Sequence, residues 1–157
     1  MIAFDTWQAI VTLLAKAGNT VDAGRLDDWL DCFAEHATYH VLSRENYERK
    51  LPLTLFQCDN KNMMRDRVLS LREANVVNIH RDQHVTGLPE ITDRGDGSFD
   101  VTSAYAVYQT DQGGFSRLFS AGVYYDNVSV ADGRAAFNAR RAVVDTFAIQ
   151  NMLSTPI

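Results

Sequence analysis

The sequence predicts an α+β fold in which helices come first and a curved, mostly antiparallel sheet follows. Apolar residues recur at helical spacing before residue 73, whereas β-rich segments occupy Ile79 to Phe147. Clusters rich in Gly and Asp separate these segments at residues 93–98, 111–114 and 132–133. Gly supplies a positive φ and Asp supplies local hydrogen bonds, so each cluster should reverse the chain. The pattern predicts a meander of four long strands in one continuous sheet.

Two helices are predicted at the beginning of the chain. The first should run from Thr6 to Gly18, with Asp5 and Gln8 as a capping box. Its apolar residues at helical spacing are Phe4, Trp7, Ile10, Val11 and Leu14. The second should run from Arg25 to Phe33. Its apolar face consists of Leu26, Trp29, Leu30 and Phe33.

A strand, a loop and a third helix are expected next. Residues 38–42 are β-branched and aromatic enough for a strand, and residues 43–56 are expected to form a loop that folds over the sheet. Asp59 or Asn60 should then cap a helix that ends at Arg72. Its inward residues should be Met64, Val68 and Leu71, and its outward residues Lys61, Arg65 and Arg72.

Curvature of the sheet is suggested by Gly122, which interrupts the apolar segment 119–125 and predicts a bulge or bend. A curved sheet whose concave face is covered by N-terminal helices is the cystatin-like, or NTF2-like, cone. Such a cone can surround a pocket.

Length and composition favour a single domain over residues 1–157, with enough apolar content for its own core (46%). A net charge of −5 disfavours nucleic-acid binding, which needs clustered Lys and Arg. Cys32 and Cys58 form neither a disulfide framework nor a zinc motif. The sequence shows no signal peptide and no apolar stretch long enough for a membrane span, which predicts a cytoplasmic protein that binds no membrane.

The histidines do not predict a metal site. His36 and His40, near Glu35, lie four residues apart, as do His80 and His84. On an extended strand that spacing corresponds to roughly 13 Å, too far for one metal to bridge.

Acid/base chemistry inside a cone would need a buried carboxylate or His beside a polar partner. Candidates are Asp66, His84, Tyr105 and Arg140. The structural alternative is that Asp66 pairs with a neighbouring Arg, and that Arg140 binds a carboxylate such as Asp145 or one from a partner chain. Nucleophile elbows and phosphate-binding loops are absent from the sequence. We therefore expect no catalytic, cofactor-binding or metal-binding residue.

The last residues, 151–157, are apolar and carry no charged side chain. Such a segment should be docked rather than free. It could pack into the cone of its own domain or against a neighbouring subunit.

Several stretches, in order and spacing over nearly the whole chain, resemble the small (beta) subunits of Rieske-type aromatic-ring-hydroxylating dioxygenases. These stretches are 28–33, 39–41, 64–68, 80–87, 104–108, 119–126, 140–145 and 153–157. Segments 44–48, 51–53 and 71–75 further resemble small subunits of enzymes that act on carboxylated aromatics, such as salicylate hydroxylase or terephthalate dioxygenase.

The resemblance implies a non-catalytic structural subunit of an oxygenase of aromatic-compound catabolism. By the same resemblance, the Rieske iron-sulfur cluster and the mononuclear iron would lie in the large (alpha) subunit. In agreement, this sequence lacks a Cys-x-His and Cys-x-x-His set. Three small subunits, packed as a trimer, would assemble with three large ones. Interface anchors could come from Tyr105, Tyr108, Tyr124, Tyr125 and Arg140, although core aromatics and a solvated Arg are the favoured interpretation for any one of them.

Two other functions stay open at this point. A stand-alone isomerase or dehydratase would use a polar pocket inside the cone, with His40 or His84 beside Tyr105 as the acid/base pair. A ligand-binding module would use the same pocket without chemistry.

Overall fold

A computed structural model describes residues 2–73, 79–145, 153 and 155–157. Its helices are α1 (Phe4–Asp22), α2 (Leu26–Leu30), α3 (Arg44–Glu48) and α4 (Lys61–Glu73). Its strands are β1 (Phe33–Ser43), β2 (Phe56–Cys58), β3 (His80–Thr86), β4 (Glu90–Asp93), β5 (Ser98–Asp111), β6 (Ser116–Ala131) and β7 (Arg134–Val144). The predicted α+β class is confirmed.

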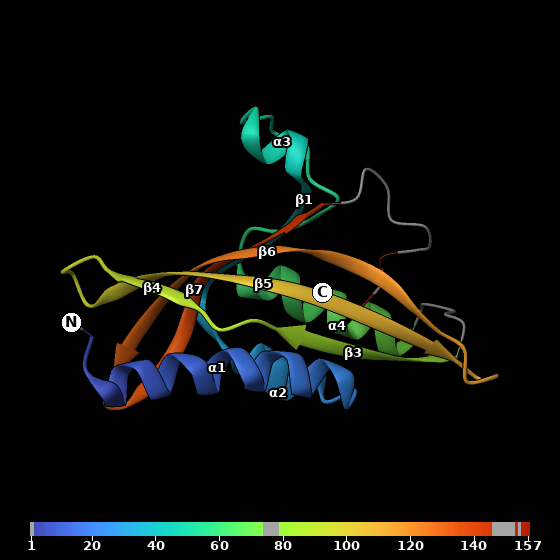
Figure 1. The fold of residues 1–157 in the computed structure, drawn as a ribbon, viewed down its shortest axis with the longest axis horizontal. Helices are drawn as coiled ribbons and strands as arrows, with labels where there is room; N and C mark the ends of the chain where they lie inside the picture. Colours follow the sequence, from blue (N-terminus) through green and yellow to red (C-terminus); the bar gives the residue numbers. More distant parts are fainter. Residues whose placement is uncertain (1, 74–78, 146–152, 154) are drawn as a thin grey trace.

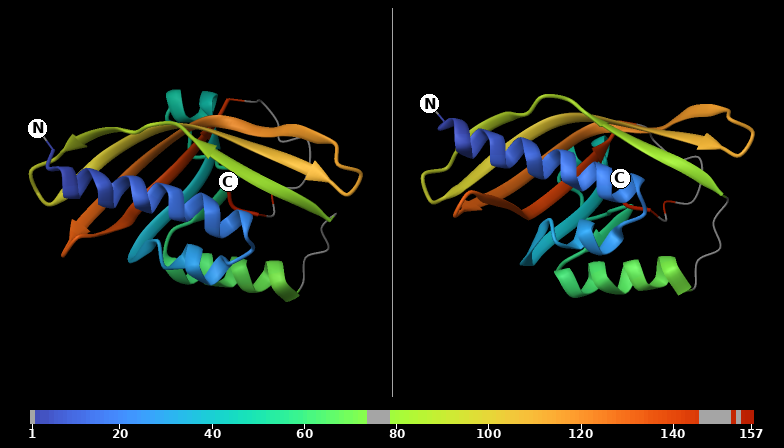
Figure 2. Two further views of the ribbon diagram at one scale, coloured as in Figure 1. Left: turned by 60° about the horizontal axis from the view of Figure 1, so that its bottom comes forward. Right: turned by 90° about the horizontal axis from the view of Figure 1, so that it is seen from below.

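The strands form one curved sheet in the order β2-β1-β7-β6-β5-β3, and β4 also pairs with β5. All pairs are antiparallel except β1 and β7, which run parallel. Figures 1 and 2 show the sheet arching over α1, α2 and α4, while α3 stands beyond the other face. The helices therefore cover the concave face, as the predicted cone requires.

The first two helices differ from the prediction at their ends. α1 is longer in both directions, and its N-cap is Ala3 without a side-chain hydrogen bond, so the predicted capping box is wrong. Phe4 and Trp7 stack on each other at the surface, with their ring centroids 5.9 Å apart. α2 is shorter, because Phe33 already pairs with Phe137 on β7. A distant strand thus determines where β1 begins.

Segment 43–56 is more ordered than a loop. The Ser43 hydroxyl accepts the Asn46 N–H at 3.2 Å and caps α3, and β2 begins at Phe56. The predicted cap at Asn60 of α4 is confirmed, since its side-chain oxygen accepts the Met63 N–H at 3.0 Å. Met64 and Val68 of α4 face the core as predicted.

Lys61 was expected to face solvent, and this is wrong. Its side chain is buried, and its ammonium donates to the Phe33 carbonyl at 2.7 Å and lies 3.4 Å from Glu35. The long apolar stem of Lys is buried while its charge finds partners at the start of β1.

The three predicted turns are present. Gly95, Gly97, Gly114 and Gly133 have positive φ, and Asp132 does too. The first segment of the meander divides into β3 and β4, which both pair with β5.

Gly122 allows two strands to approach closely but does not form the predicted bulge. The register shifts lie between Val107 and Tyr108 and between Asn127 and Val128. A Cβ atom on Gly122 would lie 1.9 Å from the Val143 carbonyl oxygen. Only glycine fits where β7 passes so near to β6.

Candidate functional site

Aromatic side chains fill the concave side of the sheet. Tyr105 and Tyr124, on β5 and β6, stack with their ring centroids 4.2 Å apart. Tyr39 on β1 is 1% exposed, and its hydroxyl accepts the Ile157 N–H and donates to the Ile157 backbone oxygen, both at 2.9 Å. The Tyr105 hydroxyl shares a hydrogen bond with Ser120 at 3.0 Å. The polar ends of these rings are thus satisfied within the chain.

A buried ion pair lies beside these rings. Arg140 donates to both carboxylate oxygens of Asp126, at 3.0 and 2.8 Å. Its guanidinium also lies over the rings of Tyr124 and Phe137, at 4.1 and 4.2 Å. Burial raises the pKa of Asp126, and Arg140 offsets part of that shift. Both carboxylate oxygens are occupied, so Asp126 supports structure rather than proton transfer.

Arg140 binds a carboxylate, as the structural alternative predicted, but this carboxylate is Asp126 and not Asp145, which was given as the example. Asp145 pairs instead with Arg44, the first residue of α3, 101 residues earlier in the chain. Asp126 could have been recognised from its spacing: it follows Ser120, Gly122 and Tyr124 at a period of two, so it points to the same face.

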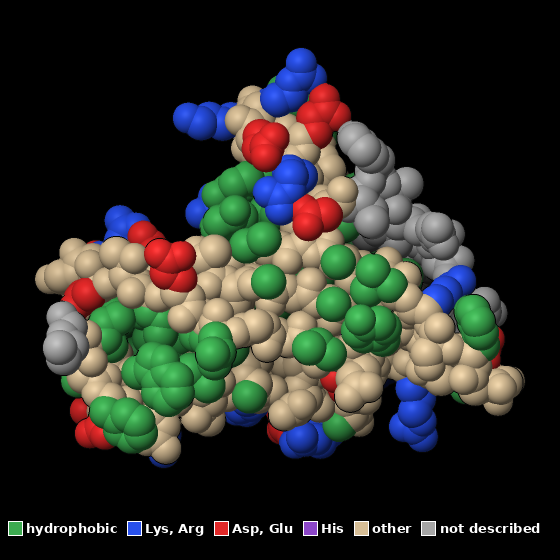
Figure 3. Space-filling view, viewed as in Figure 1, with side chains coloured by type: hydrophobic (Ala, Val, Ile, Leu, Met, Phe, Trp, Pro, Cys, Tyr) green, Lys and Arg blue, Asp and Glu red, His purple; other side chains and the backbone are tan. Residues whose placement is uncertain are grey.

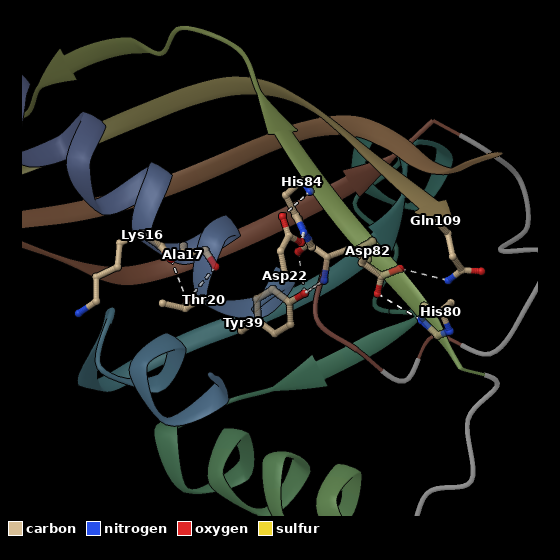
Figure 4. A network of polar contacts seen from close by, with 10 residues as sticks. Lys16, Ala17, Thr20, Asp22, Tyr39, His80, Asp82, His84 and Gln109 are labelled. Atoms are coloured by element: carbon tan, nitrogen blue, oxygen red, sulfur yellow. Dashed lines mark hydrogen bonds and ion pairs between the residues drawn. The ribbon is translucent and has the colours of Figure 1, made fainter. Parts of the chain in front are cut away.

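The other acid/base candidates have separate partners. Figure 4 shows Asp22, at the end of α1, beside the ring of His84 on β3, with 2.5 Å between His84 Nδ1 and Asp22 Oδ1. His40 contacts Asp59 at 2.8 Å. Asp66 lies exposed on α4. None of these contacts joins His40 or His84 to Tyr105.

A second group of polar side chains lies near the start of β3. His80 Nε2 is 3.4 Å from Asp82, and the Gln109 amide donates to the same carboxylate at 3.2 Å. Arg117 donates to the Gln109 carbonyl at 2.7 Å. These contacts link β3, β5 and β6 on the inner side of the sheet, where Gln109 is buried.

Burial also lowers the reactivity of the tyrosine hydroxyl and cysteine thiol groups inside the protein. It raises the pKa of Tyr105 to about 12 and that of the Cys58 thiol to about 11. The pKa of Cys32 is raised for the same reason. All three groups therefore stay protonated near neutral pH, where a nucleophile or base would have to lose its proton.

Two features are missing from the described residues. Among them, no group of three or more His, Cys, Asp and Glu side chains could hold a metal ion. In the same part of the chain, no helix has the length and apolar character needed to cross a membrane.

The outer face of the sheet carries exposed apolar side chains. Val85, Ala106, Tyr108 and Leu118, here called the outer-face patch, lie on β3, β5 and β6. Val85 is opposite Ala106, and Tyr108 is opposite Leu118. Figure 3 shows hydrophobic side chains at the surface over these strands. Sequence reasoning named only Tyr108 of this patch. Alternation along the strands could have identified Val85 and Ala106, but not Leu118, which reaches the outer face only because the register of β5 and β6 shifts between Val107 and Tyr108.

The five predicted interface anchors divide between the two faces. Tyr105, Tyr124 and Arg140 lie inside, so they belong to the core. Tyr108 and Tyr125 lie on the outer face, and Tyr125 stacks on Tyr47 of α3 with centroids 4.7 Å apart.

The final segment docks on its own domain. Pro156 and Ile157 are buried, and the Leu153 carbonyl accepts a hydrogen bond from Arg67 at 3.2 Å. Of the two expected locations, the chain's own cone is therefore the observed one for these residues. Residues 151, 152 and 154 lie outside the described part of the chain.

Comparisons with known proteins agree with this geometry. The family model for the ring hydroxylating beta subunit matches residues 17–151. The anthranilate 1,2-dioxygenase small subunit of Burkholderia cepacia is 38% identical over 97% of this chain and 94% of that relative. A terephthalate 1,2-dioxygenase beta subunit of a Comamonas species is 27% identical over 94% and 96%.

A solved structure shares the fold along nearly its whole length. It is the crystal structure assigned to the beta subunit of an aromatic-ring-hydroxylating dioxygenase from Novosphingobium aromaticivorans, with a TM-score of 0.88 and 34% identity over 97% of both chains. The family match, the identity and the shared fold lead to one conclusion: this chain belongs to the family of ring-hydroxylating dioxygenase beta subunits.

Proposed function

We propose that this chain is a non-catalytic structural subunit that holds together an aromatic-ring-hydroxylating dioxygenase. The observation that carries the proposal is the contrast between an inner face whose polar groups named above have partners within the chain and an outer face that exposes apolar side chains. Inside, Asp126, Arg140 and Tyr39 have partners within the chain, which leaves no free acid/base pair among them. Outside, the outer-face patch exposes apolar area of the kind that subunit interfaces bury.

The iron centres would then belong to the large subunit. A Rieske cluster needs two Cys and two His ligands around its two irons. In this chain Cys32 is buried between α2 and β1, Cys58 is buried on β2, and His40 and His84 contact carboxylates. These residues do not fit such a cluster. We therefore assign to this chain no catalytic, cofactor-binding or metal-binding residue.

We also propose where the chain acts and with which partners. The chain would act as one domain over residues 1–157, in the cytoplasm, within an assembly of three small and three large subunits. Its relatives named for anthranilate and terephthalate dioxygenases support a carboxylated aromatic as the substrate of the assembly. The stand-alone isomerase or dehydratase is disfavoured because His40, His84 and Tyr105 have separate partners.

Co-expression with a large subunit and size-exclusion chromatography test the proposal. Wild-type chain should co-elute with the large subunit, and a chain that never does so would refute the assignment. Leu118→Asp should lower the amount of this chain that co-elutes with the large subunit at least tenfold, because burying a charge in an apolar interface is unfavourable. Leu69→Asp is the matched control: Leu69 on α4 is 52% exposed and Leu118 is 53% exposed. Both variants should keep the unfolding temperature of the wild type.

A further inference from the structure

We propose that the cone contains a ligand site, and that its resident ligand is the chain's own segment Thr155–Ile157. Ile157 is 3% exposed and lies in the main core cluster. It is 118 residues away from Tyr39, to which it is bound. Figures 1 and 2 show the end of the chain between the sheet and the helical layer.

The recognition at Tyr39 has the form of ligand binding. One hydroxyl accepts the N–H of Ile157 and donates to its backbone oxygen, each at 2.9 Å. Burial raises the pKa of Tyr39 far above its ordinary value, so the hydroxyl remains a donor. A few polar groups that fix orientation within apolar walls are typical of small-molecule sites.

The Tyr39 ring is held in place by elements other than the segment. The Tyr39 ring makes edge contacts with Trp29 on α2, Phe33 on β1 and Phe56 on β2, at centroid distances of 5.5, 6.2 and 5.4 Å. These three elements hold the Tyr39 ring through packing that does not include Ile157. The segment thus behaves as an occupant of a site that other residues build.

A second contact holds the chain just before the segment. Arg67 donates to the Leu153 carbonyl at 3.2 Å, and its guanidinium lies over Phe56 at 4.6 Å. Phe56 therefore contacts both Tyr39 and Arg67.

The occupant indicates the class of ligand that the site accepts. It combines a backbone N–H donor and a neighbouring carbonyl-type acceptor with a branched aliphatic side chain. An empty site would leave the Tyr39 hydroxyl buried without these two partners, which is unfavourable. A vacated site therefore binds short apolar peptides and small N-acylated aliphatic amino acids.

A truncated chain lacking residues 155–157 tests this inference. N-acetyl-Thr-Pro-Ile, added in trans and followed by calorimetry, should bind it saturably and raise its unfolding temperature. Binding should be at least tenfold weaker when Tyr39→Phe is added to the truncation, and at least tenfold weaker for N-acetyl-Thr-Pro-Gly. The full chain should bind at least tenfold more weakly than the truncated chain, because its site is occupied.

Two results would overturn the inference: a folded truncated chain that does not bind the peptide, or equal affinity for the truncated and full chains. If the truncated chain does not fold, Ile157→Ala in the full chain replaces it. This change weakens the resident segment, so the peptide should bind at least tenfold more tightly than to the wild type. Equal affinity for the Ile157→Ala variant and the wild type would contradict the proposal.

Discussion

Arg140 and Arg141 are neighbours on β7, yet the two faces of the sheet give them opposite environments. Arg140 is 4% exposed and pairs with Asp126 between two aromatic rings, whereas Arg141 is exposed on the outer face. Tyr105 and Tyr108 on β5 show the same contrast, at 4% and 45% exposure. These polar groups of the inner face have their hydrogen-bond and ion-pair partners within the chain, while the outer face leaves surface for another molecule. Changes on the inner face should therefore affect folding, and changes on the outer face should affect assembly.

The largest expected effect is that of Gly122→Ala. The new Cβ would lie 1.9 Å from the Val143 carbonyl oxygen, and backbone cannot move aside without disturbing the β6–β7 pairing. We expect a loss of about 4 kcal/mol or more in the free energy of unfolding, or no folded protein. Urea denaturation followed by circular dichroism measures the loss.

Gly87→Ala is the matched control for this change. A Cβ atom there would meet Ala104 at 3.6 to 3.8 Å, which is ordinary contact. A loss at Gly87 as large as that at Gly122 would show that close strand approach is not the cause.

Breaking the buried ion pair should have the next largest effect. Arg140→Met leaves Asp126 buried without its partner, and such a loss costs about 3–5 kcal/mol in the free energy of unfolding. Arg141→Met, on the outer face, should cost less than about 0.5 kcal/mol. The double change Arg140→Met with Asp126→Leu should recover most of the loss. A double variant no more stable than Arg140→Met would contradict this account of the pair.

Alkaline pH should destabilise the inner face. The ordinary pKa of Cys58 is 9.0, and burial raises it to about 11 in the folded chain. Between these values the unfolded chain loses the thiol proton and the folded chain keeps it, so stability falls as pH rises. Between pH 9 and pH 11 the loss is about 2 kcal/mol, because the full slope of about 1.36 kcal/mol per pH unit applies only midway between the two pKa values. Urea unfolding from pH 8 to pH 11 should show a shallower slope for Cys58→Ala, and an unchanged slope would exclude Cys58 as the cause.

The smallest effect is expected at an exposed ion pair. Arg49 lies 2.7 Å from Glu45 on α3, with both side chains largely in solvent. Arg49→Ala should change the free energy of unfolding by less than about 0.5 kcal/mol. Thermal unfolding should place this variant next to the wild type, and a loss above 1 kcal/mol would mean that α3 contributes more to stability than its contacts indicate.

Features set by neighbouring residues could be predicted from the sequence. The three turns follow from local Gly and Asp chemistry, and the cap at Asn60 follows from its position before an apolar pattern. Features that depend on distant pairing could not. The start of β1 depends on Phe137, and the burial of Lys61 depends on the Phe33 carbonyl.

The functional surfaces show the same division. A period of two assigns strand residues to two faces, but it does not tell which carboxylate on β6 lies opposite Arg140. Nor does it show which face the helices leave uncovered. The contact between Tyr39 and Ile157 joins residues with no local pattern in common, so only the folded arrangement reveals it.

The parallel pairing of β1 with β7 has a consequence for the order of folding. Ser43 is opposite Val144, and Phe33 is opposite Phe137. During synthesis β1 leaves the ribosome long before β7 exists, so one of its edges stays unpaired while roughly 100 further residues are added. Contacts so distant in sequence form slowly, and an unpaired edge can pair with other chains. β7, which closes this edge, is therefore the element whose arrival ends the aggregation-prone stage of the newly made chain.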